Sequence, residues 1–366
     1  MHKNRGPVYY ADYLQLDKLL DAQLPLSKKY GEECHDEMLF ILVHQTYELW
    51  FKQIIHEIAD VQRIFSQEEI DEKEIHLAVT RLQRIQKVQE VIQGHLGVLE
   101  TMTPMDFLEF RDLLVPASGF QSVQFREIEI RLGLKTDQRE GVDREFFTGR
   151  LNDQDKSRID ETEKVTSVFD SMEAWLERLP FTQQKIFDFW EQYAAAVDQM
   201  LEEDHKLIVE NPTLNDKMRE IQLTHLEMTR STFNALLNEE NYEAWQAEGN
   251  IRLSRKALFN ALFIFLYREE PVLQQPFQFL NMLIDIDEGF TSWRYRHALM
   301  AQRMLGTKIG TGGSSGHKYL KKATQNNRIF LDLFNLSTFL IPKAYLPELP
   351  HDVKKQLDFF FSRVGV

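Results

Sequence analysis

The sequence contains a single cysteine, Cys34, in 366 residues. One cysteine excludes an internal disulfide, a metal cluster held by several thiolates, and the two-cysteine attachment of a c-type haem. A chain of this length buries about three quarters of its surface on folding, so it needs no disulfide and has room for an internal cofactor. These features predict a protein of a reducing, cytoplasmic compartment.

Long hydrophobic runs and an excess of positive charge are also missing. The most apolar stretch, Ala257–Tyr267, is about half as long as a membrane span and contains Asn260. The first ten residues, MHKNRGPVYY, lack the apolar core of a signal peptide. The net charge of −14, from 43 basic and 57 acidic residues, repels phosphate backbones and anionic lipids. We therefore expect no membrane segment, no export signal and no nucleic-acid partner.

Glycine (16) and proline (11) are too few for the frequent turns of an all-β sandwich or barrel. Apolar residues recur instead at a spacing near 3.6, which predicts helices. The predicted helical runs are Leu39–Ile58, Ile75–Leu99, Gln121–Leu132, Gln183–Val209, Asn215–Leu237, Ser254–Leu266, Phe277–Leu283 and Ser292–Leu305. The polar segment Lys135–Lys164 indicates a solvated excursion or a polar helix pair rather than core. We predict an all-α protein with one domain over residues 1–366, in which 135–250 is a polar insertion with poorly assigned helices.

The run HDEMLFILVHQTYELWFKQ, residues 35–53, carries the first candidate site. At about 100° per residue, Phe40, His44, Tyr47 and Phe51 fall on one helical stripe, so an imidazole lies among aromatic rings. Such a stripe could form the wall of a pocket for a flat ligand. The alternative is a core histidine that hydrogen-bonds a backbone carbonyl, and the spacing alone favours that alternative.

The second candidate is Arg126 in SGFQSVQFREIEIRLG, residues 118–133, a helix that Ser118 could cap. A guanidinium suits a carboxylate because its planar fork donates two parallel hydrogen bonds. The helix also carries further charged residues, Glu127, Glu129 and Arg131. A surface salt bridge is therefore the simpler interpretation of Arg126 from the sequence alone.

The third candidate is His297, which has apolar neighbours on its helical face: Trp293, Met300, Ala301 and Met304. One nitrogen donor on a dry, flat wall is what an axial haem ligand requires. Nearby arginines could meet carboxylates such as propionates, namely Arg294, Arg296 and Arg303. A purely structural histidine is the alternative.

A glycine-rich loop, Gly310–Gly316, follows that helix. It does not fit a phosphate-binding loop, because Lys308 precedes the glycines and Ser315 stands where a dinucleotide motif has its third glycine. The loop is either a flexible linker or backbone that packs closely against a bound molecule. In the second case the Thr311 hydroxyl could point at a polar group of that molecule.

Taken together, these segments resemble the tryptophan 2,3-dioxygenases, helical haem enzymes that open the indole ring. The resemblance rests on five segments in the family's order, which span nearly the whole chain. They are YYADYLQLDKLL (9–20), HDEMLFILVHQTYELWFKQ (35–53), SGFQSVQFR (118–126), WRYRHALMAQRMLGTKIGTGGSSG (293–316) and LDLFNLSTFLIP (331–342).

The resemblance implies a role for each candidate residue. His297 matches the proximal haem ligand, and Phe51, Trp293 and Gly312 belong to the segments around the cofactor. His44 matches the distal histidine that hydrogen-bonds the indole N–H, and Phe40 matches the aromatic residue beside it. Arg126 matches the arginine that pairs with the substrate carboxylate, and Thr311 the threonine near its ammonium group. Tyr10, Tyr13 and Leu14 match an N-terminal arm, within residues 1–30, that reaches the pocket of a neighbouring subunit.

The reaction that the resemblance implies inserts both atoms of O2 across the indole C2=C3 bond of L-tryptophan, giving N-formylkynurenine. This is the first step of tryptophan catabolism by the kynurenine route. The resemblance also implies non-covalent haem b, ferrous in the active form, and a homotetramer. His44 is expected to position the substrate rather than remove its proton, because an indole N–H is too weak an acid for imidazole.

Two other classes of protein remain as alternatives. Helical di-iron proteins use paired Glu-x-x-His motifs, and this chain contains Glu32-x-x-His35 and Glu202-x-x-His205. A helical binding or scaffold protein could keep the same fold without the reaction. The glycine-rich loop and Arg126 argue against a pure scaffold, since neither helps helices to pack.

Overall fold

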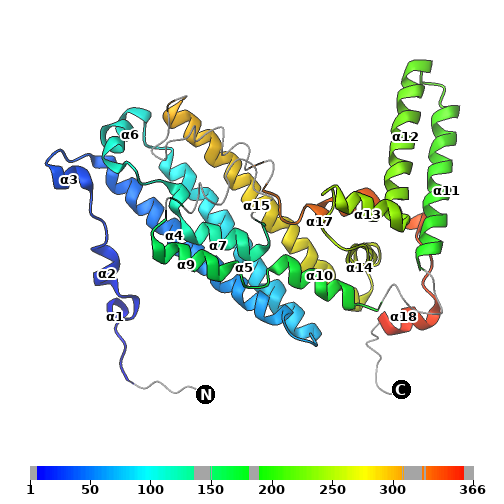
Figure 1. Cartoon of the computed structure of the whole chain (residues 1–366), viewed down its shortest axis with the longest axis horizontal. Coiled ribbons are helices and arrows are strands. Elements are labelled where there is room, and N and C mark those ends of the chain that lie inside the picture. The colour runs from blue at the N-terminus through cyan, green and yellow to red at the C-terminus, as the bar shows by residue number, and fades with distance from the viewer. Residues whose placement is uncertain are drawn as a thin grey trace, which may run out of the picture. The chain divides into compact units, whose positions relative to one another are not determined.

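A computed structural model of the chain describes residues 6–135, 149, 151–180, 189–306, 308, 324 and 327–357. These residues form helices and loops with no strand among them (Figure 1), which confirms the predicted all-α class. Across this part of the chain, no helix is long and apolar enough to span a membrane. The cytoplasmic location stays a prediction.

Where the structure describes them, the predicted runs coincide with helices whose ends differ from the prediction: α4 (His35–Phe65), α5 (Glu72–Leu99), α7 (Val123–Leu132), α11 (Phe189–Glu210), α12 (Asp216–Leu237), α14 (Arg255–Leu266) and α15 (Gln274–Leu305). Three further helices lie outside the predicted runs, namely α6 (Pro104–Arg111), α10 (Val168–Arg178) and α13 (Glu239–Ala247), and α9 (Asp153–Thr162) lies in the segment predicted to be polar. Two predicted runs, Phe277–Leu283 and Ser292–Leu305, are parts of the single helix α15. The predicted cap of α7 is wrong: Ser122, and not Ser118, is the N-cap and accepts the Phe125 N–H.

The chain divides into two compact units, which are described separately. Unit 1 comprises residues 1–56, 85–165 and 288–328, and unit 2 comprises 57–84, 166–287 and 329–366. Helices α4, α5 and α15 contribute residues to both. The single-domain organisation stays a prediction.

In unit 1, side chains of α4 hydrogen-bond its neighbouring helices. The Tyr47 hydroxyl donates to the Ile92 carbonyl of α5 at 2.9 Å, and burial raises the pKa of Tyr47 to about 12. The Gln124 amide of α7 donates to both the carbonyl and the carboxylate of Glu48, each at 2.8 Å. These bonds fix the rotation of α4 and therefore the direction of its aromatic stripe.

Helices α5 and α15 approach closely at Gly289. A Cβ atom on Gly289 would lie 2.5 Å from Oε1 of the buried Gln89, so no side chain fits there without displacing that amide. Gln93 lies one helical turn further along α5, and its side-chain amide donates to the Gly289 carbonyl at 3.3 Å. The backbone carbonyl of Gln93 accepts a hydrogen bond from Arg296 at 3.1 Å. The close approach places the last turns of α15 directly against α5.

The N-terminal arm is exposed up to α3 (Leu26–Tyr30), where it is held by α4. Neither α1 (Tyr10–Leu14) nor α2 (Leu16–Leu20) has a buried residue. The carboxylate of Glu37 on α4 accepts the Leu26 and Ser27 N–H groups at 2.8 and 2.9 Å and also the Ser27 hydroxyl. Glu37 is 1% exposed, so the start of α3 is tied to α4 by a buried carboxylate.

Part of the polar insertion is core, contrary to the prediction of a solvated excursion. Leu151 precedes α9 and Ile159 lies on it, and both form a buried apolar cluster with Val123 and Ile130 of α7. The sequence did not indicate a buried face on α9, because only Ile159 and Thr162 of its ten residues are buried. One apolar side chain in ten residues gives almost no periodic signal.

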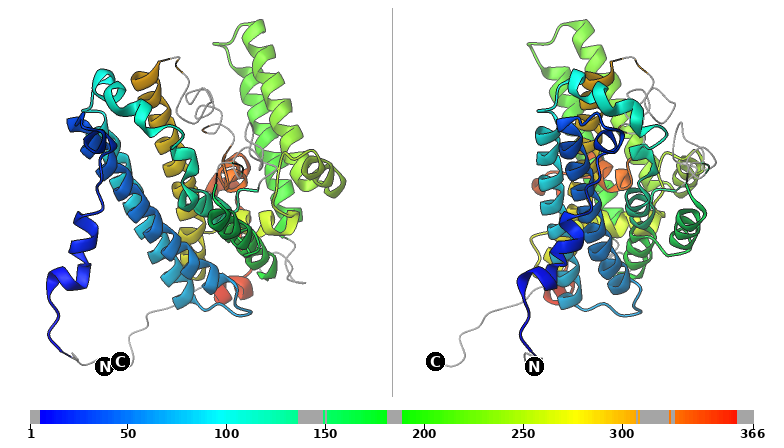
Figure 2. Two further views of the ribbon diagram at one scale, coloured as in Figure 1. Left: turned by 60° about the vertical axis from the view of Figure 1, so that its left-hand side comes forward. Right: turned by 90° about the vertical axis from the view of Figure 1, so that its left-hand side faces the viewer.

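In unit 2, short helices pack in pairs. Helices α11 and α12 lie side by side as an antiparallel hairpin (Figures 1 and 2). Helix α10 packs on α14, where Asn260 donates to the Leu176 carbonyl at 2.9 Å. The final segments include α17 (Leu331–Asn335) and α18 (His351–Leu357). The Asp332 carboxylate accepts the Arg252 and Leu253 N–H groups, each at 2.8 Å, and holds α17 to the start of α14.

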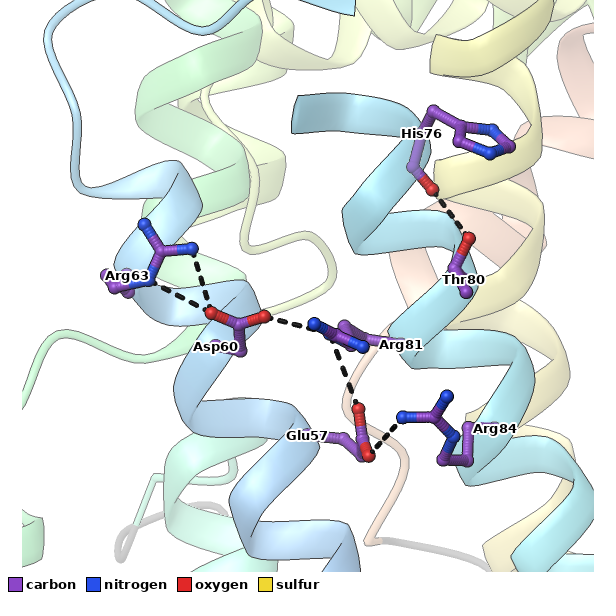
Figure 3. A network of polar contacts seen from close by, with 7 residues as sticks. All are labelled: Glu57, Asp60, Arg63, His76, Thr80, Arg81 and Arg84. Carbon is purple, nitrogen blue, oxygen red and sulfur yellow. Dashed lines mark hydrogen bonds and ion pairs between the residues drawn. The ribbon is translucent and has the colours of Figure 1, made fainter. Parts of the chain in front are cut away.

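The unit 2 portions of α4 and α5 are joined by charged side chains (Figure 3). Glu57, which is 2% exposed, accepts from Arg84 at 2.8 Å and lies 3.6 Å from Arg81. Arg81 also donates to Asp60 at 2.8 Å, and this bond and the Arg63 contact hold the pKa of Asp60 below its usual range. The network of five alternating charges fixes the register of the two helices.

Candidate functional site

His44 lies on the exposed side of the aromatic stripe of α4. Its Nδ1 is 2.7 Å from the Phe40 carbonyl oxygen, which can only accept, so Nδ1 carries the proton and Nε2 presents a lone pair. The ring remains accessible to solvent, yet the protein around it lowers its pKa by desolvation, against a smaller opposite effect of the Phe40 carbonyl. A neutral imidazole with Nε2 as an acceptor follows. The hydrogen bond to a backbone carbonyl, which the core-histidine alternative predicts, is present. The ring is nevertheless exposed and does not belong to the core.

The stripe predicted around His44 is confirmed by ring contacts. The His44 ring centroid is 4.1 Å from that of Phe40 and 6.5 Å from that of Tyr47, which is 6.0 Å from Phe51. Helix α6 adds two phenylalanines that the sequence analysis missed, Phe107 and Phe110, at 5.7 and 5.6 Å from Phe40. Their spacing of three in PMDFLEFR was the available signal. His44 is therefore held by a wall of aromatic rings from two helices.

His297 lies on α15 in the same unit. Its Nδ1 is buried and has no hydrogen-bond partner, while the ring as a whole is only half-buried. Desolvation, together with a smaller effect of the charge that His44 carries when protonated, lowers the pKa of His297 to about 4. His297 is therefore neutral near pH 7, and the two imidazoles lie within electrostatic range of each other.

Aromatic side chains connect the helices that carry the two histidines. Trp293 lies one turn before His297, with ring centroids 5.2 Å apart, and is 6.0 Å from Tyr47 of α4. Phe125 of α7 lies 5.4 Å from Phe51 and 5.1 Å from Trp293. Helices α4, α7 and α15 therefore meet in one aromatic cluster, with an imidazole on α4 and another on α15.

The donor set suits a metal held by one imidazole rather than by a cage of side chains. Among the described residues there is no group of three or more His, Cys, Asp and Glu side chains that could hold a metal ion. The di-iron alternative also lacks a suitable arrangement. Glu32 and His35 are exposed in unit 1, Glu202 and His205 are exposed in unit 2, and Glu202 pairs with Arg230 at 3.0 Å. A porphyrin needs only one neutral axial nitrogen and flat apolar walls, and His297 with Trp293 supplies both.

Arg126 is buried, so the interpretation as a surface salt bridge is wrong about the surface and right about the pairing. The side chain is 6% exposed, and its Nη1 donates to Glu129 Oε2 at 2.7 Å. The other oxygen of Glu129 accepts from Arg294 of α15 at 2.8 Å, and Glu129 itself is 2% exposed. One carboxylate therefore joins two guanidiniums from different helices.

The arginines expected to meet propionates are paired within the protein instead. Arg294 bonds Glu129 and the Asn327 carbonyl, the latter at 3.1 Å, and Arg296 lies 3.2 Å from Glu100. Arg303 is exposed. The first two therefore link helices of unit 1.

The remaining predicted site residues divide into two groups. Thr311 and Gly312, with the rest of the glycine-rich loop, lie outside the described residues. Tyr10, Tyr13 and Leu14 of the arm are 75%, 76% and 40% exposed in the single chain. The structure brings together Phe40, His44, Phe51, Trp293 and His297 in one aromatic region, and Arg126 follows Phe125, a member of that region, on α7.

The sequence is similar to those of several known proteins. The family model described as "Tryptophan 2,3-dioxygenase" matches residues 1–340. The chain is similar to a tryptophan 2,3-dioxygenase of Alteromonas mediterranea, with 50% identity over 362 residues that cover 99% of this chain and 100% of the relative. It is also similar to proteins of the same name from Bdellovibrio bacteriovorus and Dictyostelium discoideum, with 49% and 47% identity. These alignments cover 97% of this chain in both cases, and 99% and 89% of the relatives.

Proposed function

Because the chain belongs to the tryptophan 2,3-dioxygenase family, its reaction is the oxidation of L-tryptophan by O2 to N-formylkynurenine, and we propose that His297, His44 and Arg126 carry it. Enzymes of this family depend on haem. The observation that supports the assignment is the pair of neutral, electrostatically coupled imidazoles that α4 and α15 present within one aromatic cluster.

His297 is the residue that would hold the haem iron. Its ring is neutral near pH 7, as a metal ligand must be, and it is only half-buried. Haem, when bound, supplies the redox-active iron that activates dioxygen. Non-covalent haem b fits the chain because the two thiols of a covalent attachment are absent. The iron is ferrous in the active form.

His44 orients the substrate ring. Its Nδ1–H is fixed on the Phe40 carbonyl, so Nε2 accepts a hydrogen bond from the indole N–H. This contact aligns the C2=C3 edge for reaction and leaves the indole proton in place, because an indole N–H is far too weak an acid to transfer it to a neutral imidazole. Phe40 packs on the His44 ring and fixes its rotamer.

Arg126 binds the substrate carboxylate. A buried guanidinium pairs strongly with a carboxylate because little water competes for its N–H groups. A pocket that contains such a group rejects indoles that lack the carboxylate, since the guanidinium would lose that partner. Thr311 is assigned to the ammonium group of the substrate and Gly312 to a close approach to the cofactor, as the sequence predicts.

The exposed N-terminal arm completes the site in a neighbouring subunit. Tyr10, Tyr13 and Leu14 present apolar surface that is exposed in the described part of the chain. Exposed aromatic residues on a short arm are typical of a segment that docks on another subunit. The assembly is a homotetramer in which each arm is exchanged.

The assignment of His297 is tested by replacing it with alanine and measuring both cofactor and product. The protein, reduced and loaded with haem, is mixed with L-tryptophan and oxygen, and N-formylkynurenine is followed by its absorbance. We expect His297→Ala to lose the intense haem absorption of the wild type and at least 99% of its turnover, on the order of the loss when an essential group is removed. Exchange of His95, a histidine on α5 that contacts Tyr47, serves as the control and should retain haem. A haem-loaded, active His297→Ala protein would contradict the assignment.

A further inference from the structure

The strongest unassigned feature is the buried triad Arg126–Glu129–Arg294. All three side chains are buried, at 6%, 2% and 3% exposure. Glu129 uses its two oxygens separately, Oε2 for Arg126 at 2.7 Å and Oε1 for Arg294 at 2.8 Å. Hydrogen bonds between ionised groups in a buried place are the strongest that side chains form, so the triad is a fixed part of unit 1.

The two guanidiniums come from helices with different roles in the proposed reaction. Arg126 and Glu129 are three residues apart on α7, whereas Arg294 is on α15, three residues before His297. Arg294 is itself fixed, because its Nη1 donates to the Asn327 carbonyl at 3.1 Å and its guanidinium lies 5.8 Å from the Phe125 ring centroid. Glu129 therefore links Arg126 to a rigid point on the helix of the iron ligand.

A long arginine side chain can adopt many rotamers, and a site that recognises a carboxylate needs one of them. A guanidinium has five N–H donors in a fixed fork, so a single bond from Nη1 to Glu129 does not occupy the whole fork. Holding one Nη group sets the plane and direction of the whole fork. The Arg126 side chain is then already ordered before the substrate binds, so binding does not include the entropic cost of ordering it.

We propose that Glu129 is the positioning residue for substrate recognition, because it holds the Arg126 guanidinium in place and ties it, through Arg294, to the helix that carries His297. This inference rests on the proposed function, in which Arg126 binds the substrate carboxylate. Glu129 does not touch the substrate. It acts on affinity and on selectivity for the carboxylate rather than on the oxidation.

The same helix offers a matched control. Glu127 is 4% exposed and also pairs with an arginine, Arg158 of α9, and with the Thr162 hydroxyl at 3.2 Å. Exchange of Glu127 to glutamine removes a buried, paired carboxylate from α7 and leaves the bond between Arg126 and Glu129 in place. A loss of general stability should therefore be common to both variants, whereas a loss of carboxylate recognition should belong to Glu129 alone.

The experiment compares two ligands on haem-loaded protein. The Kd of L-tryptophan and that of tryptamine, which keeps the indole and the amine but lacks the carboxylate, are measured from changes in haem absorption. The KM and kcat for L-tryptophan are measured on the same preparations. For Glu129→Gln we expect the Kd and KM of L-tryptophan to rise about tenfold or more, the kcat to change by less than about threefold, and the Kd of tryptamine to stay within about twofold. For Glu127→Gln, we expect the ratio of the two Kd values to equal that of the wild type.

Arg126→Leu distinguishes failure of this inference from failure of the proposed function. If Arg126→Leu leaves the ratio of the two Kd values unchanged, Arg126 does not bind the carboxylate and the proposed function of that residue is wrong. If Arg126→Leu lowers the preference for L-tryptophan while Glu129→Gln does not, only the positioning role is wrong. An equal rise of both Kd values in Glu129→Gln also overturns the inference, because it indicates general damage to the pocket.

Two further variants test the same inference in case Glu129→Gln does not fold. Glu129→Asp keeps the charge but is shorter by one methylene, so it cannot reach both guanidiniums with the same geometry. We expect an intermediate rise in the Kd of L-tryptophan, with tryptamine unaffected. Arg294→Lys should give a similar, smaller rise, since a lysine keeps the charge without the planar fork. Wild-type ratios of the two Kd values in both variants would exclude the positioning role.

Discussion

The tautomer of His44 decides what this residue can do. The bond between Nδ1 and the Phe40 carbonyl assigns the ring proton to Nδ1, and the lowered pKa keeps the ring neutral. Such a ring can accept a hydrogen bond at Nε2 but has no second proton to donate. Positioning of the indole N–H is therefore the role that its chemistry allows.

The exchange of His44 for alanine tests positioning against proton removal. We expect kcat/KM for L-tryptophan to fall by about 10- to 100-fold with turnover still measurable, since one hydrogen bond to the substrate is lost. With 1-methyltryptophan, which has no indole N–H, wild type and variant should differ by less than about threefold. Steady-state rates with both substrates provide the measurement. Complete loss of turnover with normal tryptophan binding would instead indicate an essential base.

The sequence was informative about the histidines and much less so about Arg126. His44 and His297 stand out because aromatic or apolar residues surround them at helical spacing. Glu129 was missed because VQFREIEIRL has charged residues at alternate positions, which normally indicates a solvated helix. In fact seven of its ten residues are buried: Val123, Arg126, Glu127, Ile128, Glu129, Ile130 and Leu132. A helix that is buried on several faces has to pair its charges internally, and the partners on α9 and α15 are distant in sequence.

At the scale of secondary-structure elements, the long helices were predictable from the sequence, but the places where helices continue or connect were not. The two predicted runs of α15 are separated in sequence by IDIDEGFT, in which acidic residues and a glycine interrupt the apolar period. The helix continues because tertiary contacts use this stretch. Asp287 accepts the Ile329 and Phe330 N–H groups, at 3.1 and 3.3 Å. Such contacts depend on residues some forty positions away, which local periodicity does not contain.

The joint between α3 and α4 gives a prediction at this scale. Exchange of Glu37 for glutamine removes the carboxylate that accepts the Leu26 and Ser27 N–H groups, at a cost of about 1–3 kcal/mol for buried donors that lose a charged acceptor. Helix α3 should then detach from α4 more often, and trypsin should cleave after Lys28 and Lys29, which are exposed, several times faster.

The control for the Glu37 variant is Glu33→Gln. Glu33 forms an exposed pair with Lys28 at 3.6 Å, and such pairs contribute little to stability. Its rate of cleavage should match the wild type. Equal rates in all three proteins would show that Glu37 does not hold the arm.

At the scale of the whole molecule, the exposed arm is the feature that one chain cannot explain. Val8, Tyr9, Tyr10, Tyr13 and Leu20 are each at least 67% exposed, and they lie on or directly before two short helices without a buried residue. Composition and periodicity give no information about subunit exchange, so the proposed role of the arm in a neighbouring site comes only from the family resemblance.

Coexpression of two differently defective subunits tests the exchange. One variant carries Tyr10→Ala and Tyr13→Ala, and the other carries Arg126→Leu; each alone should have little activity. If each arm serves a neighbour, an intact pocket in the first chain can receive an intact arm from the second. About a quarter of the sites in random mixtures should then be complete. Turnover per haem in the coexpressed and the separately mixed proteins provides the measurement. Absence of any recovery on coexpression would mean that the arm acts in its own subunit or not at all.

The contact between Gly289 and Gln89 restricts how this protein can evolve. Because a methyl group at 289 would come within 2.5 Å of the amide at 89, a side chain at 289 requires the end of the Gln89 side chain to move. A smaller residue at 89 would make room for a side chain at 289. Gly289 precedes His297 by eight residues on α15, so an uncompensated substitution would shift the proposed iron ligand without altering any residue that binds substrate.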